Sequence, residues 1–182
     1  GGWQSLLQDP QVRWFLALLL AVVGLLCWHL NTSGMPLGTA IRQSSFNAVS
    51  IMTGTGYGSA NFSAWGGFAS TLLLIAMFIG GCGGSTTCGI KVFRLQVLAT
   101  TARVQISRLL RPHAVVLAYY NKRPVAPEVM DSVMGFFYLY ILCFVLLSIL
   151  LGMMGLDFVT ALSGAATSIS NVGPGLGNLI GA

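Results

Sequence analysis

The 182-residue chain is 55% hydrophobic and only 7% charged, with a formal net charge of +5. Soluble domains contain about 25% charged residues, so this composition excludes an ordinary soluble domain and indicates a membrane protein. Seven of the nine Lys and Arg residues lie within residues 91–123. A cluster of this kind between apolar blocks is typical of a cytoplasmic loop and not of a nucleic-acid-binding surface.

Two apolar segments of different length open the chain. Residues 14–30 form an apolar run with Trp at both ends, which predicts one membrane-spanning helix. Thr39 can then cap a helix over residues 39–52, which would reach only ~20 Å at ~1.5 Å per residue. Because the hydrocarbon core is ~30 Å thick, we expect a re-entrant helix followed by a loop and a return segment.

A second apolar helix is expected to be broken inside the membrane. Residues 68–79 are apolar, and five glycines follow within the next ten positions. Such a segment is unfavourable as a regular helix, so we expect a broken helix over residues 68–111. A close-packed helix interface, which also uses small residues, is the alternative. The expected intramembrane loop, interpreted as a gate, consists of Gly80, Gly81, Cys82, Gly83, Gly84, Ser85, Thr86, Thr87, Cys88 and Gly89.

The remaining elements repeat the first pattern. Residues 112–127 form a linker and residues 129–154 a second span. Asp157 can cap a short helix over residues 157–169, followed by a loop at 170–175. No further apolar span completes this second unit, and the chain does not begin with Met. We therefore expect a piece of a longer polypeptide.

The two short loops match at a spacing of 117 positions. Irregular backbone at membrane depth is tolerated where it lines a cavity or is buried in protein. Glycines let main-chain carbonyls turn inward, where they can replace the hydration shell of a monovalent cation. The preceding helices would also point their partly negative ends at that ion. Ordinary Gly-rich turns are the alternative. The predicted cation filter comprises Thr53, Gly54, Thr55, Gly56, Tyr57, Ser170, Asn171, Val172, Gly173 and Pro174.

With these residues in place, the chain resembles the TrkH-type membrane subunits of bacterial Trk potassium-uptake systems, in the Trk/Ktr/HKT superfamily. The resemblance lies in residues 78–86, 89–92, 112–115, 135–137 and 171–177. It implies an all-α polytopic membrane protein made of tandem helix–pore-loop–helix units around a pseudo-fourfold cation channel. This chain would contain the third unit (residues 1–111) and an incomplete fourth unit (residues 128–182). The TGTGYG form of the first loop departs from the family's usual threonine-rich form.

The resemblance further implies potassium uptake across the bacterial inner membrane, with K⁺ bound at the filter residues. It implies a homodimer and a cytoplasmic TrkA-like nucleotide-binding regulatory partner, which the basic linker could contact. A secondary transporter with a mid-membrane site and a non-transporting scaffold subunit remain alternatives. A membrane enzyme is disfavoured, because the apolar segments carry almost no titratable groups. No cofactor and no nucleic-acid partner are expected.

Overall fold

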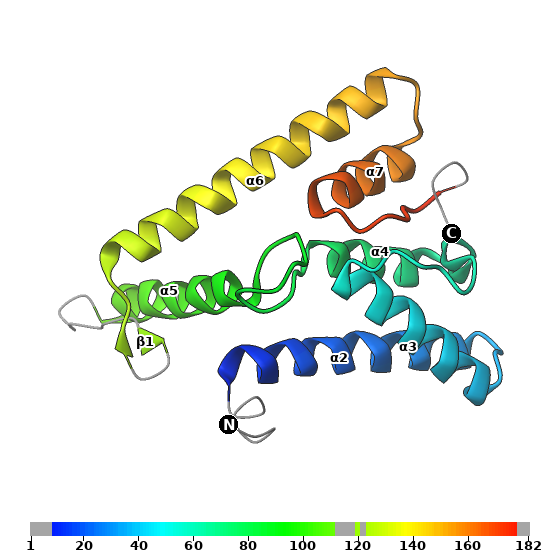
Figure 1. Ribbon diagram of the computed structural model, residues 1–182, viewed down its shortest axis with the longest axis horizontal. Coiled ribbons are helices and arrows are strands. Elements are labelled where there is room, and N and C mark those ends of the chain that lie inside the picture. Colours follow the sequence, from blue (N-terminus) through cyan, green and yellow to red (C-terminus); the bar gives the residue numbers. More distant parts are fainter. Residues whose placement is uncertain (1–8, 112–118, 121–122, 178–182) are drawn as a thin grey trace.

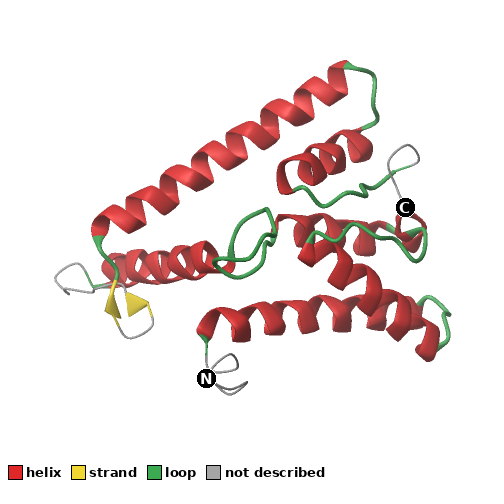
Figure 2. Ribbon diagram, viewed as in Figure 1, coloured by secondary structure: helices red, strands yellow, loops and turns green. Residues whose placement is uncertain are grey.

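The computed structural model describes residues 9–111, 119–120 and 123–177 of the chain. Helices dominate the described residues, and the two strands are only two residues each (Figure 2). The elements in chain order are α2 (Pro10–Thr32), α3 (Leu37–Thr53), the 3₁₀ helix η1 (Phe62–Trp65), α4 (Gly67–Phe78), α5 (Val92–Leu110), β1 (Tyr119–Tyr120), β2 (Arg123–Pro124), α6 (Pro127–Met153) and α7 (Phe158–Ser170).

The two long apolar helices are α2 and α6. They contain 23 and 27 residues and are long and apolar enough to cross a membrane. Each begins with Pro at its first position, where the missing N–H costs nothing. Asp9 also caps α2 by accepting a hydrogen bond from the Gln11 N–H at 2.8 Å. Much of the apolar surface of α6 is exposed, including Met153 at 80%, which suits a lipid or protein neighbour better than water.

The two short helices, α3 and α7, run toward the centre of the molecule and end there (Figure 1). Asp157 caps α7 as expected, accepting a hydrogen bond from the Thr160 N–H at 3.2 Å. The expected Thr39 cap of α3 is wrong. That helix begins two residues earlier, after Pro36, and no side chain caps it. A proline fixes φ in a range that leads directly into a helix, so Pro36 sets the start of α3 instead.

One apolar core joins the two halves of the chain. Its buried members come from α2, α3, η1, α4, α7 and the loop that follows α7. Because α7 contributes to the same core as α3, the position of one short helix constrains the other. The largest of these core residues are Leu26, Ile51, Met52, Phe62, Leu73, Met77 and Leu176.

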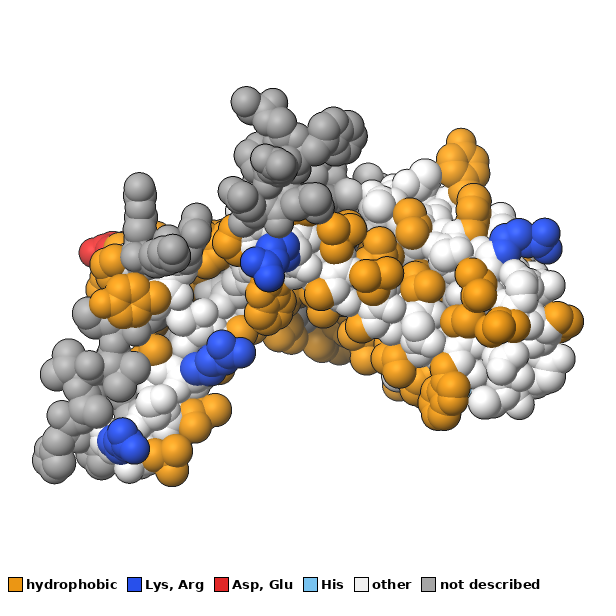
Figure 3. Space-filling model, turned by 90° about the horizontal axis from the view of Figure 1, so that it is seen from below, with side chains coloured by type: hydrophobic (Ala, Val, Ile, Leu, Met, Phe, Trp, Pro, Cys, Tyr) orange, Lys and Arg blue, Asp and Glu red, His pale blue; other side chains and the backbone are white. Residues whose placement is uncertain are grey.

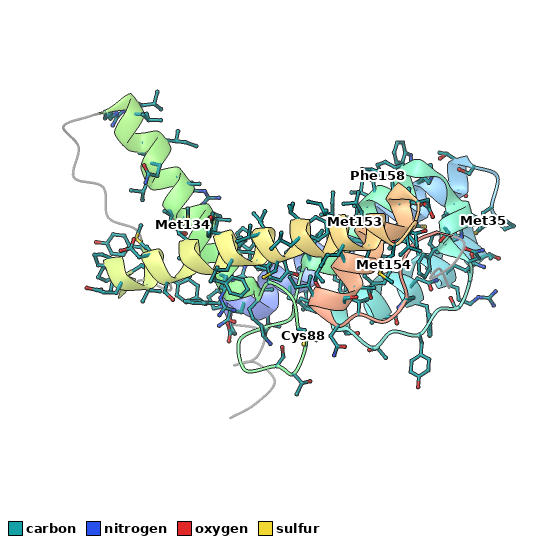
Figure 4. The ribbon with its side chains drawn as sticks, turned by 90° about the horizontal axis from the view of Figure 1, so that it is seen from above. Met35, Cys88, Met134, Met153, Met154 and Phe158 are labelled. Carbon is teal, nitrogen blue, oxygen red and sulfur yellow. The ribbon has the colours of Figure 1, made fainter. Side chains whose placement is uncertain are left out.

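The helix after residue 67 is broken, as expected. α4 ends at Phe78, and α5 begins only at Val92. The start of α5 packs against α2 and α6, and Figures 3 and 4 show its far end projecting from the other helices as an arm. Figure 3 shows Lys and Arg side chains along this arm. β1 and β2 pair antiparallel within the expected linker. Most of that linker, residues 112–118 and 121–122, lies outside the described residues.

Candidate functional site: two matched loops at the ends of the short helices

Both short helices end in the left-handed backbone conformation at equivalent positions. Gly54 closes α3 with φ 68° and ψ 23°, and Asn171 closes α7 with φ 50° and ψ 49°. The two residues are 117 positions apart. Gly and Asn are the residues that adopt this conformation most readily. The repeat that the sequence predicts is therefore also a repeat of backbone geometry.

The match continues through the loops. Thr55 N–H donates to the Ser50 carbonyl at 2.9 Å, and its equivalent Val172 N–H donates to the Thr167 carbonyl at 3.1 Å. One residue further along, Gly56 and Gly173 both have positive φ, at 79° and 113°. An L-residue is strained in this region. Each loop therefore turns away from its helix through two left-handed residues separated by one ordinary residue.

The structure brings these two loops into contact, backbone against backbone. A Cβ atom built on Gly56 would lie 2.6 Å from the Val172 carbonyl oxygen, and one built on Gly173 would lie 3.2 Å from Gly56 Cα. A Cβ on Gly54 would lie 3.5 Å from the Asn171 carbonyl oxygen. The central residues of the two predicted filter segments thus come together. Their exposed members are Thr55, Tyr57, Asn171 and Gly173, and Val172 is buried.

The first residue of each predicted filter segment belongs to the preceding helix. Thr53 and Ser170 are the last residues of their helices and not loop residues. The Thr53 hydroxyl lies 2.7 Å from that of Thr55. The Ser170 hydroxyl instead lies 2.6 Å from the hydroxyl of Tyr140 on α6. Tyr57 is 71% exposed.

Polar side chains that the sequence analysis did not single out hold the segments that follow the two loops. Asn47 of α3 donates from Nδ2 to Ser59 Oγ at 2.9 Å and accepts from Ser59 N–H at 3.1 Å. Ser163 of α7 accepts from Leu176 N–H at 2.9 Å and donates to the Leu176 carbonyl at 2.9 Å. Ser59 and Leu176 are again 117 positions apart. The signal that could have predicted these contacts is the presence of polar residues inside short apolar helices, because buried polar groups need hydrogen-bond partners.

The glycine-rich loop between α4 and α5 is closed at its neck and held at its tip. Gly80 N–H donates to the Ile90 carbonyl at 2.9 Å, and Ile90 N–H donates to the Phe78 carbonyl at 2.8 Å. At the tip, Gly83 N–H donates to Gln11 Oε1 of α2 at 2.7 Å. Figure 1 places this loop beyond the central ends of α3 and α7, and Figure 4 labels Cys88 on it.

Hydrogen bonds within the glycine-rich loop leave little room for larger residues. Lys91 Nζ donates to the Ser85 carbonyl at 2.5 Å, and the Ser85 and Thr87 hydroxyls lie 2.6 Å apart. A Cβ on Gly81 would lie 2.7 Å from Ser85 Oγ, and one on Gly80 would overlap the Cys88 carbonyl. The predicted loop at 80–89 lies between the end of α4 at Phe78 and the start of α5 at Val92, and its tight internal bonding was not foreseen.

The electrostatics of the contact between the loops come from the backbone. Neither loop carries an acidic or basic side chain, and both helices point their partly negative C-terminal ends at it. In the described parts of the chain, no group of three His, Cys, Asp or Glu side chains could hold a metal ion. At the opposite end of α7, hydrogen bonds from the Thr160 side chain and N–H lower the pKa of Asp157 below its ordinary value.

Fold and site together define a polytopic helical membrane protein with re-entrant short helices whose ends meet through main-chain contacts. The chain belongs to the TrkH family: the family model described as "Cation transport protein" matches residues 3–181. This family is one of transport proteins and not of enzymes.

Relatives of known name agree with this assignment. The chain is 42% identical over 182 residues to the Trk system potassium uptake protein TrkI of Halomonas elongata, covering 100% of this chain and 37% of that protein. It is 37% identical over 175 residues to the Trk system potassium uptake protein TrkH of Vibrio parahaemolyticus, covering 94% of this chain and 36% of that protein. The chain thus spans little more than a third of these relatives.

The fold also matches a solved structure. The crystal structure of the potassium transporter TrkH from Vibrio parahaemolyticus aligns with a TM-score of 0.89 and 34% identity, covering 98% of this chain and 38% of that one. The expected fold class is confirmed by this similarity.

Proposed function

We propose that this chain is part of a protein that takes up K⁺ through a filter of main-chain carbonyls. The observation that carries the proposal is the contact between two loops of equal backbone geometry, in which Gly56 and Gly173 lie against each other without side chains between them. Carbonyl rings of this kind replace the hydration shell of a monovalent cation without a fixed charge that would trap it. The relatives are named as potassium uptake proteins, which supports K⁺ as the ion.

Two loops cannot surround an ion, so the proposal requires partners for them. Because the chain spans about 37% of its relatives, we infer that the loops at 53–57 and 170–174 supply two quarters of a four-part filter, as third and fourth units. The missing quarters would come from the rest of a full-length protein. We expect the full-length sequence to contain two further segments with the sequence pattern of these loops.

The glycine-rich loop at 80–89 is proposed to be the gate. Its neck follows directly from α4, which packs in the same core as the filter helices. It also lies beyond the ends of those helices (Figure 1). A glycine-rich segment that already interrupts a membrane helix can change conformation without breaking further helical hydrogen bonds.

Assembly in the bacterial inner membrane, as a homodimer with a TrkA-like nucleotide-binding subunit, completes the proposal. It rests on family membership, on the two helices able to span a membrane and on the basic arm formed by α5 (Figure 3). Cross-linking of the full-length protein in membranes would test the dimer, and co-purification with the regulatory subunit would test the partner.

Uptake of ⁸⁶Rb⁺ by the full-length protein in liposomes tests the function itself. We expect K⁺ to compete with ⁸⁶Rb⁺ for uptake and Na⁺ not to compete. A scaffold subunit would give no flux, and a transporter with a discrete site would give saturable exchange without single-channel currents. Either outcome would contradict the channel-like filter.

A further inference from the structure

Tyr140 of α6 makes a buried contact with the start of the second loop. Its hydroxyl lies 2.6 Å from the hydroxyl of Ser170, the last residue of α7. Tyr140 is 9% exposed and Ser170 is 2% exposed. Within the described residues, Tyr140 is the hydrogen-bond partner of the Ser170 side chain, and the left-handed residue Asn171 follows Ser170 directly. Buried hydroxyl pairs of this kind fix position strongly, because water does not compete with them.

Aromatic neighbours hold the Tyr140 ring in place. The ring of Phe136, one turn earlier on α6, lies 5.6 Å from it, and the ring of Phe78 lies 6.2 Å away, edge to face. Phe78 is the last residue of α4 and itself packs edge to face on Phe144 at 5.1 Å. A side chain whose rotamer is fixed by packing on two helices can position a partner more precisely than a free one.

Within the described part of the chain, the first loop has no such hydroxyl contact with the long helix α2. Thr53, the equivalent of Ser170, donates to the Val49 carbonyl of its own helix at 2.7 Å and pairs with Thr55 in its own loop. The hydroxyl at the end of α3 is thus satisfied locally. The hydroxyl at the end of α7 is satisfied by a different helix. Thr53 is therefore held by its own helix and loop, whereas Ser170 is held by α6.

We propose that Tyr140 is a positioning residue for the second loop: its hydroxyl, held by the Phe78 and Phe136 rings, fixes Ser170 and through it the direction of the carbonyls from Asn171 onward. This inference rests on the proposed filter function. Because ion selectivity of a carbonyl site depends on where its oxygens lie, loss of this one hydrogen bond changes selectivity more than it changes folding.

The test uses the full-length protein in liposomes and compares the K⁺-to-Na⁺ permeability ratio of variants. Tyr140→Phe keeps the ring and its packing but removes the hydroxyl, and the ratio is expected to fall about five- to tenfold, the size of effect of one buried hydrogen bond. Ser170→Ala is expected to have the same effect. The double variant should lose no more than either single variant, since both remove one interaction. Ser170→Thr keeps a hydroxyl and should retain selectivity.

Tyr138→Phe is the matched control, because Tyr138 lies on the same helix, two residues away, with 68% of its side chain exposed. Its permeability ratio should equal that of the unmodified protein. An unchanged ratio in a folded Tyr140→Phe variant would overturn the inference while leaving the filter proposal intact. If the unmodified protein itself fails to discriminate K⁺ from Na⁺, the proposed function fails instead. Additive losses in the double variant would also overturn the inference.

Discussion

Gly56 and Gly173 lie against each other so closely that a side chain on either would meet the backbone around the other. A Cβ on Gly56 would lie 2.6 Å from the Val172 carbonyl oxygen, and one on Gly173 would lie 3.2 Å from Gly56 Cα. Real Cβ atoms essentially never approach another heavy atom within 3.0 Å. Position 56 therefore requires glycine for two reasons, the positive φ and the lack of space for a Cβ atom.

Gly56→Ala is the direct test of that contact. The left-handed conformation costs an L-residue about 1–2 kcal/mol, and the new Cβ would displace the Val172 carbonyl, so selectivity for K⁺ over Na⁺ should fall at least about tenfold. The measurement is competition of Na⁺ with ⁸⁶Rb⁺ uptake by the full-length protein. Gly24→Ala in α2 is the control, because a Cβ there meets nothing within 4 Å. Equal competition by Na⁺ in the two variants would show that the glycine contact has no role in selectivity for K⁺ over Na⁺.

Ser163→Ala should loosen the return segment of the second loop. It would leave both the N–H and the carbonyl of buried Leu176 without the Ser163 hydroxyl, which costs about 1–3 kcal/mol. Thermal unfolding in detergent and hydrogen exchange at the Leu176 amide measure this loss. Ser148→Ala is the control, since that hydroxyl donates only to the Phe144 carbonyl of its own helix. Exchange at Leu176 that matches the control would show that Ser163 does not hold the segment.

The sequence predicted the helices and the loops because their signals are local. Apolar run length separates α2 and α6 from the short helices, and the glycines predict the break after Phe78. Partners far apart in the chain carry no such signal. Neither the hydroxyl contact of Tyr140 with Ser170 nor the hydrogen bond from Gly83 to Gln11 follows from any periodicity. The wrong Thr39 cap shows the limit of local rules as well, because α3 begins at Leu37, directly after Pro36, without a side-chain cap.

Gln11→Ala should release the tip of the glycine-rich loop. Gln11 Oε1 accepts the hydrogen bond from Gly83 N–H and so links the loop to the start of α2. If residues 80–89 form a gate, the variant should raise basal ⁸⁶Rb⁺ flux several-fold, because one hydrogen bond of about 1 kcal/mol no longer favours this conformation. Gln105→Ala on the exposed side of α5 is the control. Unchanged flux with normal protein yield would contradict a role for this bond in gating.

Asp157 should make the start of α7 sensitive to acid. Hydrogen bonds from the Thr160 hydroxyl, at 2.5 Å, and from the Thr160 N–H lower the pKa of Asp157. A lowered pKa means that the carboxylate stabilises the folded helix end above the ordinary aspartate pKa. This contribution is lost as the pH falls toward the lowered value. Amide exchange over residues 158–162 should accelerate in that window, relative to its normal pH dependence. Asp157→Asn should remove the extra dependence, and its persistence would exclude Asp157 as the cause.

Ser50 and Thr167 occupy equivalent positions but bind their loops differently. Thr167 Oγ1 accepts from Gly173 N–H at 2.9 Å. Among the described residues, Ser50 Oγ is buried without a hydrogen-bond partner, and Gly56 N–H donates to the Ser50 carbonyl at 3.5 Å. Ser50→Thr should place a hydroxyl acceptor at the Gly56 N–H, as Thr167 does at the equivalent Gly173 N–H. The variant should slow exchange of the Gly56 amide about fivefold. Ser50→Val has the same shape without a hydroxyl and should not. Equal exchange in the two variants would mean that the difference between the loops does not arise at Ser50.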